Sequence, residues 1–261
     1  MMPNSVQGTL DVVKYILIPI EVAFISYIMY SVIMNIRKTR QSSLEKVHPI
    51  EALRGSLDTT FNHSKMVPVL AYELSLLYYA LFSWKMKPYS RSGSSSFSYH
   101  INSGALIVVL FASKLLLLEG ALVHILLTQW SHMVAWLISF GNLYIILMLI
   151  SEIRAMYINP ILISDKGMTI RYGNQMLAEI KGETIESVSA IKFDKLSKEQ
   201  LKSSFTPLFT EPNIFIQLNT PITVMGAYGV RKKVDQIYLF LDQPQEFIQK
   251  SNTIIVKQNE Q

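Results

Sequence analysis

Residues 104–127, GALIVVLFASKLLLLEGALVHILL, and residues 132–156, HMVAWLISFGNLYIILMLISEIRAM, decide the fold of this chain. A helix that crosses a membrane needs about 20 mostly apolar residues, and both segments meet that requirement. Only residues 128–131 separate them, so the two helices must form an antiparallel hairpin. Trp130 and Trp136 at its turn are typical of the boundary between lipid and water.

Two further apolar segments, at about 13–35 and 66–84, bring the expected number of spans to four. The first is too long for the core of a signal peptide, and no small-residue cleavage site follows it, so we expect it to remain as an anchor. The second is short and contains Pro68 and Glu73. A second interpretation therefore stays open, in which 66–84 is re-entrant and only three segments cross.

The overall composition agrees with a membrane protein. Half of the 261 residues are hydrophobic and 16% are charged, which argues against an average soluble domain or a disordered chain. Residues 1–157 hold 12 of the 24 Lys and Arg but only 8 of the 19 Asp and Glu. Because the basic excess belongs to the apolar half, it indicates membrane orientation and headgroup contact, and we expect no nucleic-acid partner. The chain has no cysteine, which excludes a disulfide framework and thiolate chemistry.

The orientation of the spans is less clear from the charges. The turn 128–131 lacks Lys and Arg, which places the C-terminal part on the cytoplasmic side of the cell membrane. Four spans then put the loop 37–65 outside, although it carries six basic residues and looks cytoplasmic. Within this polar loop, Ser43–Phe61 has apolar residues at helical spacing and is expected to form an amphipathic helix capped by Ser42 or Ser43.

After Tyr157 the apolar residues alternate with polar ones, which is the period of a strand. Residues 161–164 and 168–172, separated by Asp165-Lys166-Gly167, predict a β-hairpin. Strands are also expected at 176–180, 187–193, 213–218, 221–225 and 236–241, followed by a helix with Asp242 as its N-cap. We therefore divide the chain into a transmembrane helical domain, 1–157, and a small antiparallel β domain, 158–261. The stretch 90–98 is a flexible tether by composition.

The sequences NPILISDKGMTIRYG, ETIESVSAIKFD and YLFLDQPQEF resemble the bacterial PH-like domains. That resemblance implies a seven-stranded barrel with a C-terminal helix. Together with AYELSLLYYALFSW, FSYH and LEGALVHILL, these segments are similar to a group of bacterial membrane proteins in which several spans precede such a domain. The resemblance covers about residues 66–258 and implies a cytoplasmic β domain.

PH domains that bind phosphoinositides carry a basic cluster around the first hairpin, and here that turn offers one Lys beside one Asp. The better basic candidate for a lipid headgroup is Arg231, Lys232 and Lys233, which we place in a loop after Gly229. The alternative is that these three charges form a solvated loop tip.

Several ionisable residues lie well inside the apolar segments, where they are costly. They are Glu21, Glu73, Lys114, Glu119 and His124. Lys114 and Glu119 are five residues apart, about 140° around a helix, so they do not share a face. We hypothesise an interhelical polar cluster in which Lys114 neutralises Glu73 or Glu21, and Glu119 is protonated or bonded to His124 indirectly. A purely structural charge pair, a proton or solute path and an intramembrane active site are the alternatives.

His100 lies at the mouth of the span that begins at 104, where it is an interface candidate that could act as a base or belong to the aromatic belt. No nucleotide-binding, zinc-protease or serine-hydrolase motif is present, and we expect no metal and no cofactor. The sequence therefore favours a non-catalytic membrane-anchored interaction or regulatory protein, with the bilayer and a protein as partners of its β domain. The alternative function is an intramembrane enzyme or small transporter that uses the buried Glu, Lys and His residues.

Overall fold

The computed structural model describes residues 30, 48–61, 64–192 and 203–259. The chain divides into two compact units, 1–71 and 72–261. Apart from Tyr30, the predicted segment 13–35, with Glu21, lies outside the described residues. Among the described residues the structure has five α-helices and eight strands.

In the first unit, the helix α3 spans Pro49–Thr60. His48 is its N-cap, because its Nδ1 accepts a hydrogen bond from the Ile50 N–H at 3.2 Å, and Pro49 supplies a first-turn residue that needs no hydrogen-bond partner. The apolar residues Leu53 and Leu57 are buried. This confirms a helix in the loop 37–65, whereas the serines expected to cap it lie outside the described residues.

The apolar segment 66–84 is shorter as a helix than as a hydropathy pattern. The α-helix α4 spans Val67–Leu77 and continues as the π-helix η2, Tyr78–Phe82. Pro68 stands in the first turn of α4, where its missing N–H breaks no helical bond. At about 1.5 Å per residue this helix is shorter than the hydrocarbon core of a bilayer, so its crossing stays a prediction.

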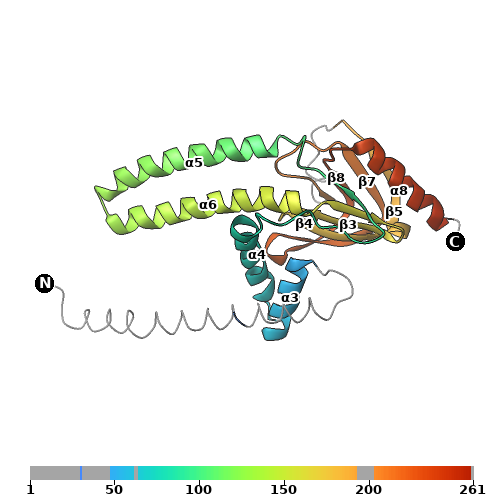
Figure 1. Ribbon diagram of the computed structural model, residues 1–261, viewed down its shortest axis with the longest axis horizontal. Helices are drawn as coiled ribbons and strands as arrows, with labels where there is room; N and C mark the ends of the chain where they lie inside the picture. Colours follow the sequence, from blue (N-terminus) through green and yellow to red (C-terminus); the bar gives the residue numbers. More distant parts are fainter. Residues whose placement is uncertain (1–29, 31–47, 62–63, 193–202, 260–261) are drawn as a thin grey trace. The chain divides into compact units, whose positions relative to one another are not determined.

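The predicted hairpin is present. The helices α5, Ala105–Thr128, and α6, His132–Ile158, are both long and apolar enough to cross a membrane. They lie side by side and project from the sheet, with their connecting turn farthest from it (Figure 1). Ser131 caps α6 by accepting a hydrogen bond from the Val134 N–H. Few side chains in the apolar parts of the two helices are buried, 6% in α5 and 11% in α6, as expected for helices that face lipid.

The hairpin is inserted between two neighbouring strands. β1, Ser95–Phe97, precedes α5, and β2, Ile161–Ser164, follows α6. The two strands pair antiparallel, with Ser95 opposite Ile163 and Phe97 opposite Ile161. The interpretation of 90–98 as a flexible tether is therefore wrong for 95–97, because these residues gain strand partners that composition alone does not reveal.

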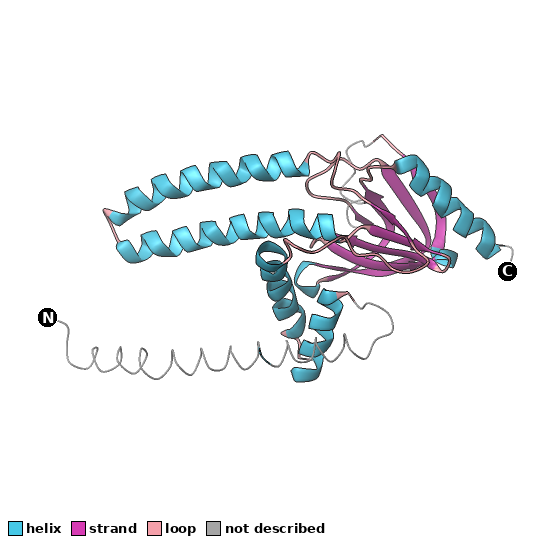
Figure 2. Ribbon diagram, viewed as in Figure 1, coloured by secondary structure: helices cyan, strands magenta, loops and turns pink. Residues whose placement is uncertain are grey.

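The sheet continues from β2 as a meander and then folds over itself, as the strands in Figure 2 show. β3, Gly167–Tyr172, and β4, Met176–Lys181, follow β2 through tight turns. The long strand β7, Ile214–Gly226, pairs with β4 through its last residues and with β5, Ile185–Ala190, through its first half. The chain thus connects two sets of strands through one bent strand.

The bend of β7 coincides with Pro221. The register of β7 with β8, Arg231–Leu239, shifts between Gln217 and Ile222. Proline cannot donate a hydrogen bond to a neighbouring strand, which favours such an irregularity. The sequence prediction of two strands here, 213–218 and 221–225, is corrected to one irregular strand.

Eight strands form one mostly antiparallel sheet in the order β1-β2-β3-β4-β7-β8-β6, with β5 also on β7. Among the strands of the described residues, only β6, Ser204–Phe205, pairs parallel, with β8. The two end strands of the sheet, β1 and β6, do not pair with each other, so the sheet is not closed. The predicted antiparallel β domain is confirmed, and a closed barrel is not.

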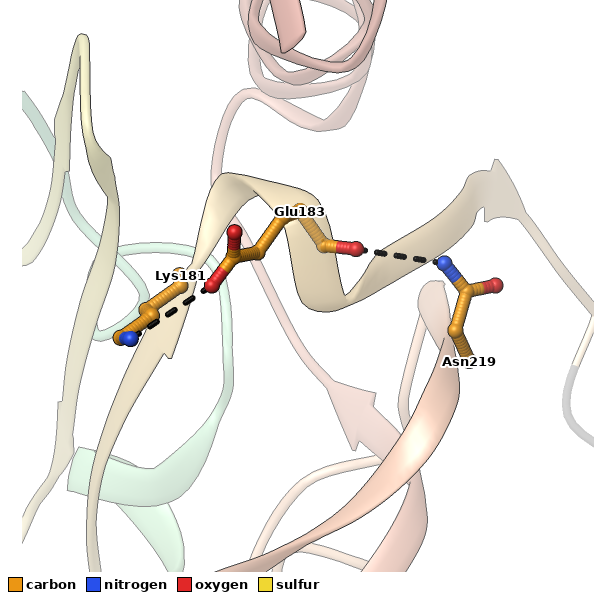
Figure 3. Close-up of polar contacts among 3 residues, drawn as sticks. All are labelled: Lys181, Glu183 and Asn219. Carbon is orange, nitrogen blue, oxygen red and sulfur yellow. Dashed lines mark hydrogen bonds and ion pairs between the residues drawn. The ribbon is translucent and has the colours of Figure 1, made fainter. Parts of the chain in front are cut away.

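A short 3₁₀ turn, η3, Gly182–Thr184, joins β4 to β5. Figure 3 shows Asn219 of β7 donating from Nδ2 to the Glu183 carbonyl at 3.3 Å. The same view shows the Glu183 carboxylate 3.5 Å from Lys181 Nζ. Both charged side chains are largely exposed, so the amide contact rather than the ion pair positions this turn.

The terminal helix α8, Pro244–Asn259, covers β5 and the sheet core. Phe247 is fully buried and meets Phe97 of β1 edge to face at 5.2 Å. Asp242 is not the N-cap of α8 as expected, because the helix begins two residues later. Its carboxylate instead accepts hydrogen bonds from the N–H groups of Ile101 and Asn102, at 3.2 and 2.7 Å, and so ties the entrance of α5 to the sheet.

Candidate functional site at the junction of the hairpin and the sheet

The four described members of the hypothesised intramembrane cluster have separate surroundings. The Tyr144 hydroxyl of α6 donates to the Glu73 carboxylate, 2.9 Å from each oxygen. His124 Nδ1 lies 2.7 Å from Ser139 Oγ. Lys114 and Glu119 are exposed on α5. Within the described part of the chain, no hydrogen bond or ion pair joins any two of these four residues.

His124 belongs to a polar seam between α5 and α6. Asn142 Nδ2 donates to the Leu116 carbonyl at 2.8 Å, across the hairpin. Gly120 makes room for this contact, because a Cβ there would overlap the Asn142 amide. A groove of about 460 Å³ is lined by His124, Ser139, Asn142 and apolar neighbours. Glu73, Lys114 and Glu119 do not line it, so the proton or solute path proposed from sequence gains no support from this groove.

A buried carboxylate that the sequence analysis missed connects α6 to the sheet. Glu152 is 6% exposed, and its oxygens accept from the Asn174 N–H at 2.8 Å and from Gln175 Nε2 at 2.6 Å. Asn174 Nδ2 also donates to Ser151 Oγ at 2.9 Å. Two consecutive helix residues thus hold the turn between β3 and β4. The pattern Glu152-x-Arg154 at the end of an apolar run was the signal that could have revealed it.

Arg154 makes the second connection, to the residues that follow η2. Its guanidinium donates to Ser83 Oγ at 3.2 Å and to the Ser83 carbonyl at 2.6 Å. The same group lies 5.0 Å from the Trp84 ring and 4.9 Å from the Tyr157 ring. An arginine between two aromatic faces gains cation–π attraction while its fork stays hydrogen-bonded.

His100, the interface candidate, lies next to this arrangement. Its ring meets Tyr157 edge on at 5.3 Å, and its Nδ1 is buried without a hydrogen-bond partner among the described residues. Burial lowers the pKa of His100, and the nearby Asp242 carboxylate opposes that shift. The neutral imidazole is therefore favoured. The surroundings are those of an aromatic packing residue, and among the described residues no set of metal ligands accompanies it.

A cavity of about 340 Å³ lies where α6 meets the sheet. Its polar lining includes Glu152, Asn174, Gln175 and Thr206, whose buried Oγ1 has no hydrogen-bond partner in the described part of the chain. Its apolar lining comes mainly from Met148, Leu149, Leu208 and Phe209. Pockets of this size, with a mostly apolar lining and a few polar groups, hold small molecules in other proteins.

The basic triplet is placed differently from the sequence prediction. Arg231, Lys232 and Lys233 lie on β8, not in a loop, because the preceding turn ends at Val230. Residues of a strand alternate between faces, so Arg231 and Lys233 share the exposed side. Lys232 Nζ instead donates to the Ser204 carbonyl at 2.7 Å.

The turn before these residues lies beside α6. The Tyr228 ring is 4.2 Å from the Tyr72 ring, and the residue after Tyr72, Glu73, bonds Tyr144 in the middle of α6. Tyr228 has a left-handed backbone, φ +55°, and its side chain is partly exposed. We call five exposed residues the basic edge: Leu208, which lines the same cavity as Ala227, and Tyr228, Val230, Arg231 and Lys233.

Comparison of the sequence with protein-family models, with curated proteins and with solved structures finds no match. The geometry defines a class: two apolar helices that could span a membrane, followed by a mostly antiparallel eight-stranded sheet.

Proposed function

We propose that this chain is a multi-pass membrane protein whose β domain is an interaction module that contacts the anionic cytoplasmic surface of its own membrane. It is further proposed to belong to the bacterial membrane proteins with a C-terminal PH-like domain. Seven strands, β2 to β8, followed by the helix α8 support the second proposal.

The basic edge is the observation that carries the proposal. Leu208 and Val230 are 76% and 65% exposed, which is unusual for apolar side chains that have no partner surface. Arg231 follows Val230 directly on β8, and Lys233 shares the exposed side of that strand, so both add positive charge. Apolar side chains that enter the headgroup region, with Lys or Arg beside them, are the usual means of contact with anionic lipid, and each charge contributes about 1 kcal/mol.

The insertion of the hairpin between β1 and β2 explains how the contact is made. The start of α5 and the end of α6 are each joined to one of two adjacent strands. The β domain therefore has to lie on the side of the membrane where α5 begins and α6 ends. Tyr72, Tyr144 and Tyr228 keep the turn of the basic edge beside α6. A module fixed in this way does not pay the entropy of binding the membrane from solution, so two charges are enough for a response to lipid composition.

The test uses the absence of native cysteines. Val230→Cys, labelled with an environment-sensitive fluorophore and reconstituted as the full chain, is compared in neutral vesicles and in vesicles containing phosphatidylserine. We expect a blue-shifted emission that increases with the anionic lipid. Lys250→Cys, on the exposed side of α8, is the matched control and should stay water-like in both.

The double variant Arg231→Gln, Lys233→Gln should remove the dependence on anionic lipid. The same removal by Lys232→Gln alone would contradict the proposal, because Lys232 is bonded to Ser204. Identical emission of the Val230 label in both kinds of vesicle would also contradict it.

A further inference from the structure

The outward face of α5 carries a heptad pattern. Large apolar residues recur at alternating spacings of three and four, and each is 50–70% exposed: Val108, Phe111, Leu115, Leu118, Leu122 and Ile125. The residues of α5 that face α6, such as Val109, Leu116 and Gly120, lie on the other side of the helix. At about 100° per residue, the centres of the two stripes are roughly 145° apart. Apart from Ile125, which also lines the groove between α5 and α6, the heptad stripe thus lies away from the hairpin's own packing.

Lipid satisfies an apolar face, so this stripe alone would require no partner. The two charged residues beside the stripe do require a partner. Lys114 and Glu119 lie on opposite flanks of the stripe, each about 70° from its centre. Both are exposed near the middle of the 24-residue helix, and within the described chain neither forms a hydrogen bond or an ion pair. Charged groups at this depth almost always face the interior of a helix bundle or a water-filled cavity, where they pair with one another or with backbone carbonyls.

The spacing of the two charges specifies that partner. With Leu115 and Leu118 at heptad positions a and d, Lys114 is at g and Glu119 at the following e. In a parallel pair of helices, a g residue meets the e residue five positions later on the other helix, and such pairs set partner choice and orientation. Lys114 of one copy therefore meets Glu119 of a second copy, and the same contact recurs across the two-fold axis.

We propose that a second copy of this chain packs on this face of α5 and forms a parallel homodimer with two reciprocal Lys114–Glu119 ion pairs. Two copies of one chain cross the membrane in the same direction, so their α5 helices are parallel to each other. The other flanking positions, Ile107, Ala112, Ala121 and Leu126, are uncharged. A shift by one heptad would leave both charges unpaired, so the ion pairs also fix the register.

The inference rests on the hairpin crossing the membrane. Its first test is cross-linking between single cysteines, which is clean because the chain has none of its own. Leu118→Cys is expected to give a disulfide-linked dimer of the full chain upon oxidation in membranes. Leu117→Cys is the matched control. Leu117 is as exposed as Leu118, at 59% against 62%, but lies about 130° around the helix from the centre of the heptad stripe. This variant should stay monomeric.

The second test is a charge exchange on the Leu118→Cys background. Lys114→Glu or Glu119→Lys alone turns both ion pairs into repulsions and should weaken dimerisation by more than about tenfold. The double variant Lys114→Glu, Glu119→Lys should restore it. Chains carrying the two single changes, expressed together with different tags, should cross-link with each other in preference to themselves. This rescue separates pairing from a simple folding defect.

Equal cross-linking at 117 and 118, no restoration in the double variant, or an adduct of position 118 within one chain or with a different protein would overturn the homodimer. Alkaline extraction distinguishes the two proposals. A chain that stays in the membrane but is monomeric refutes only the dimer, whereas a chain that is released refutes the membrane-spanning function as well.

Discussion

The carboxylate of Glu152 accepts a hydrogen bond from the backbone N–H of Asn174 at 2.8 Å. This contact joins the last turns of an apolar helix to the turn between β3 and β4. Gln175 Nε2 donates to the other oxygen of the carboxylate at 2.6 Å, so both oxygens have a donor. One buried acidic residue thus contributes two hydrogen bonds to the junction between α6 and the sheet.

Replacing Glu152 by Gln should destabilise this junction. The amide has the same shape, but one acceptor becomes a donor that faces another donor, so one of the two hydrogen bonds is lost. We expect a loss of about 1.5–3 kcal/mol, typical of a buried hydrogen bond to a charged group. Thermal unfolding of the purified chain in detergent measures it. Glu186→Gln, on the exposed side of β5, is the control. Equal stability of the two variants would show that the Glu152 contacts contribute nothing.

Gly173 gives a second, steric test of the same junction. Its backbone is left-handed, φ +54°, and a Cβ would overlap the carboxylate of Glu152. Gly173→Ala should therefore cost about 2 kcal/mol or more, from backbone strain together with displacement of the carboxylate. Gly93→Ala is the matched control, since Gly93 has φ +74° but open space around its Cβ position. The difference between their unfolding temperatures isolates the clash, and no difference would mean that the carboxylate moves aside freely.

The apolar runs of α5 and α6 were predictable because length and hydropathy alone determine such helices, and their ends agree within two residues. The meander from Ile161 to Lys181 was equally accessible, since Asp165-Lys166-Gly167 is a strong turn signal. These features depend on near neighbours in the sequence, so a single chain reveals them.

The pairing of distant residues was not predictable. β1 becomes a strand only because Phe97 meets Ile161 and Phe247, which lie 64 and 150 positions away. Similarly, Glu73 was expected to find a cation, but a tyrosine hydroxyl of another helix satisfies it. Sequence spacing limits which residues of one helix can meet, whereas partners on other elements depend on packing.

Arg154→Lys should loosen the segment that follows η2. Lysine keeps the charge but loses the planar fork that binds Ser83 twice and stacks on Trp84 and Tyr157. We expect a loss of about 2 kcal/mol and faster tryptic cleavage after Lys85. Arg231→Lys, at an exposed position on β8, should change neither. Unchanged cleavage in Arg154→Lys would show that charge alone holds this segment.

The last prediction concerns acid. Burial lowers the pKa of His100 from its ordinary 6.5, so the unfolded chain binds the proton more readily than the folded chain. Stability is therefore lost as the pH falls below about 6.5, and the loss levels off below the folded pKa. His100→Phe keeps the edge-on contact with Tyr157 and removes the titration. Its unfolding temperature should fall less between about pH 7.5 and 5.5 than that of the wild type. His132→Asn, at the exposed start of α6, should keep the wild-type slope. An equal slope in His100→Phe would assign the acid sensitivity to other groups.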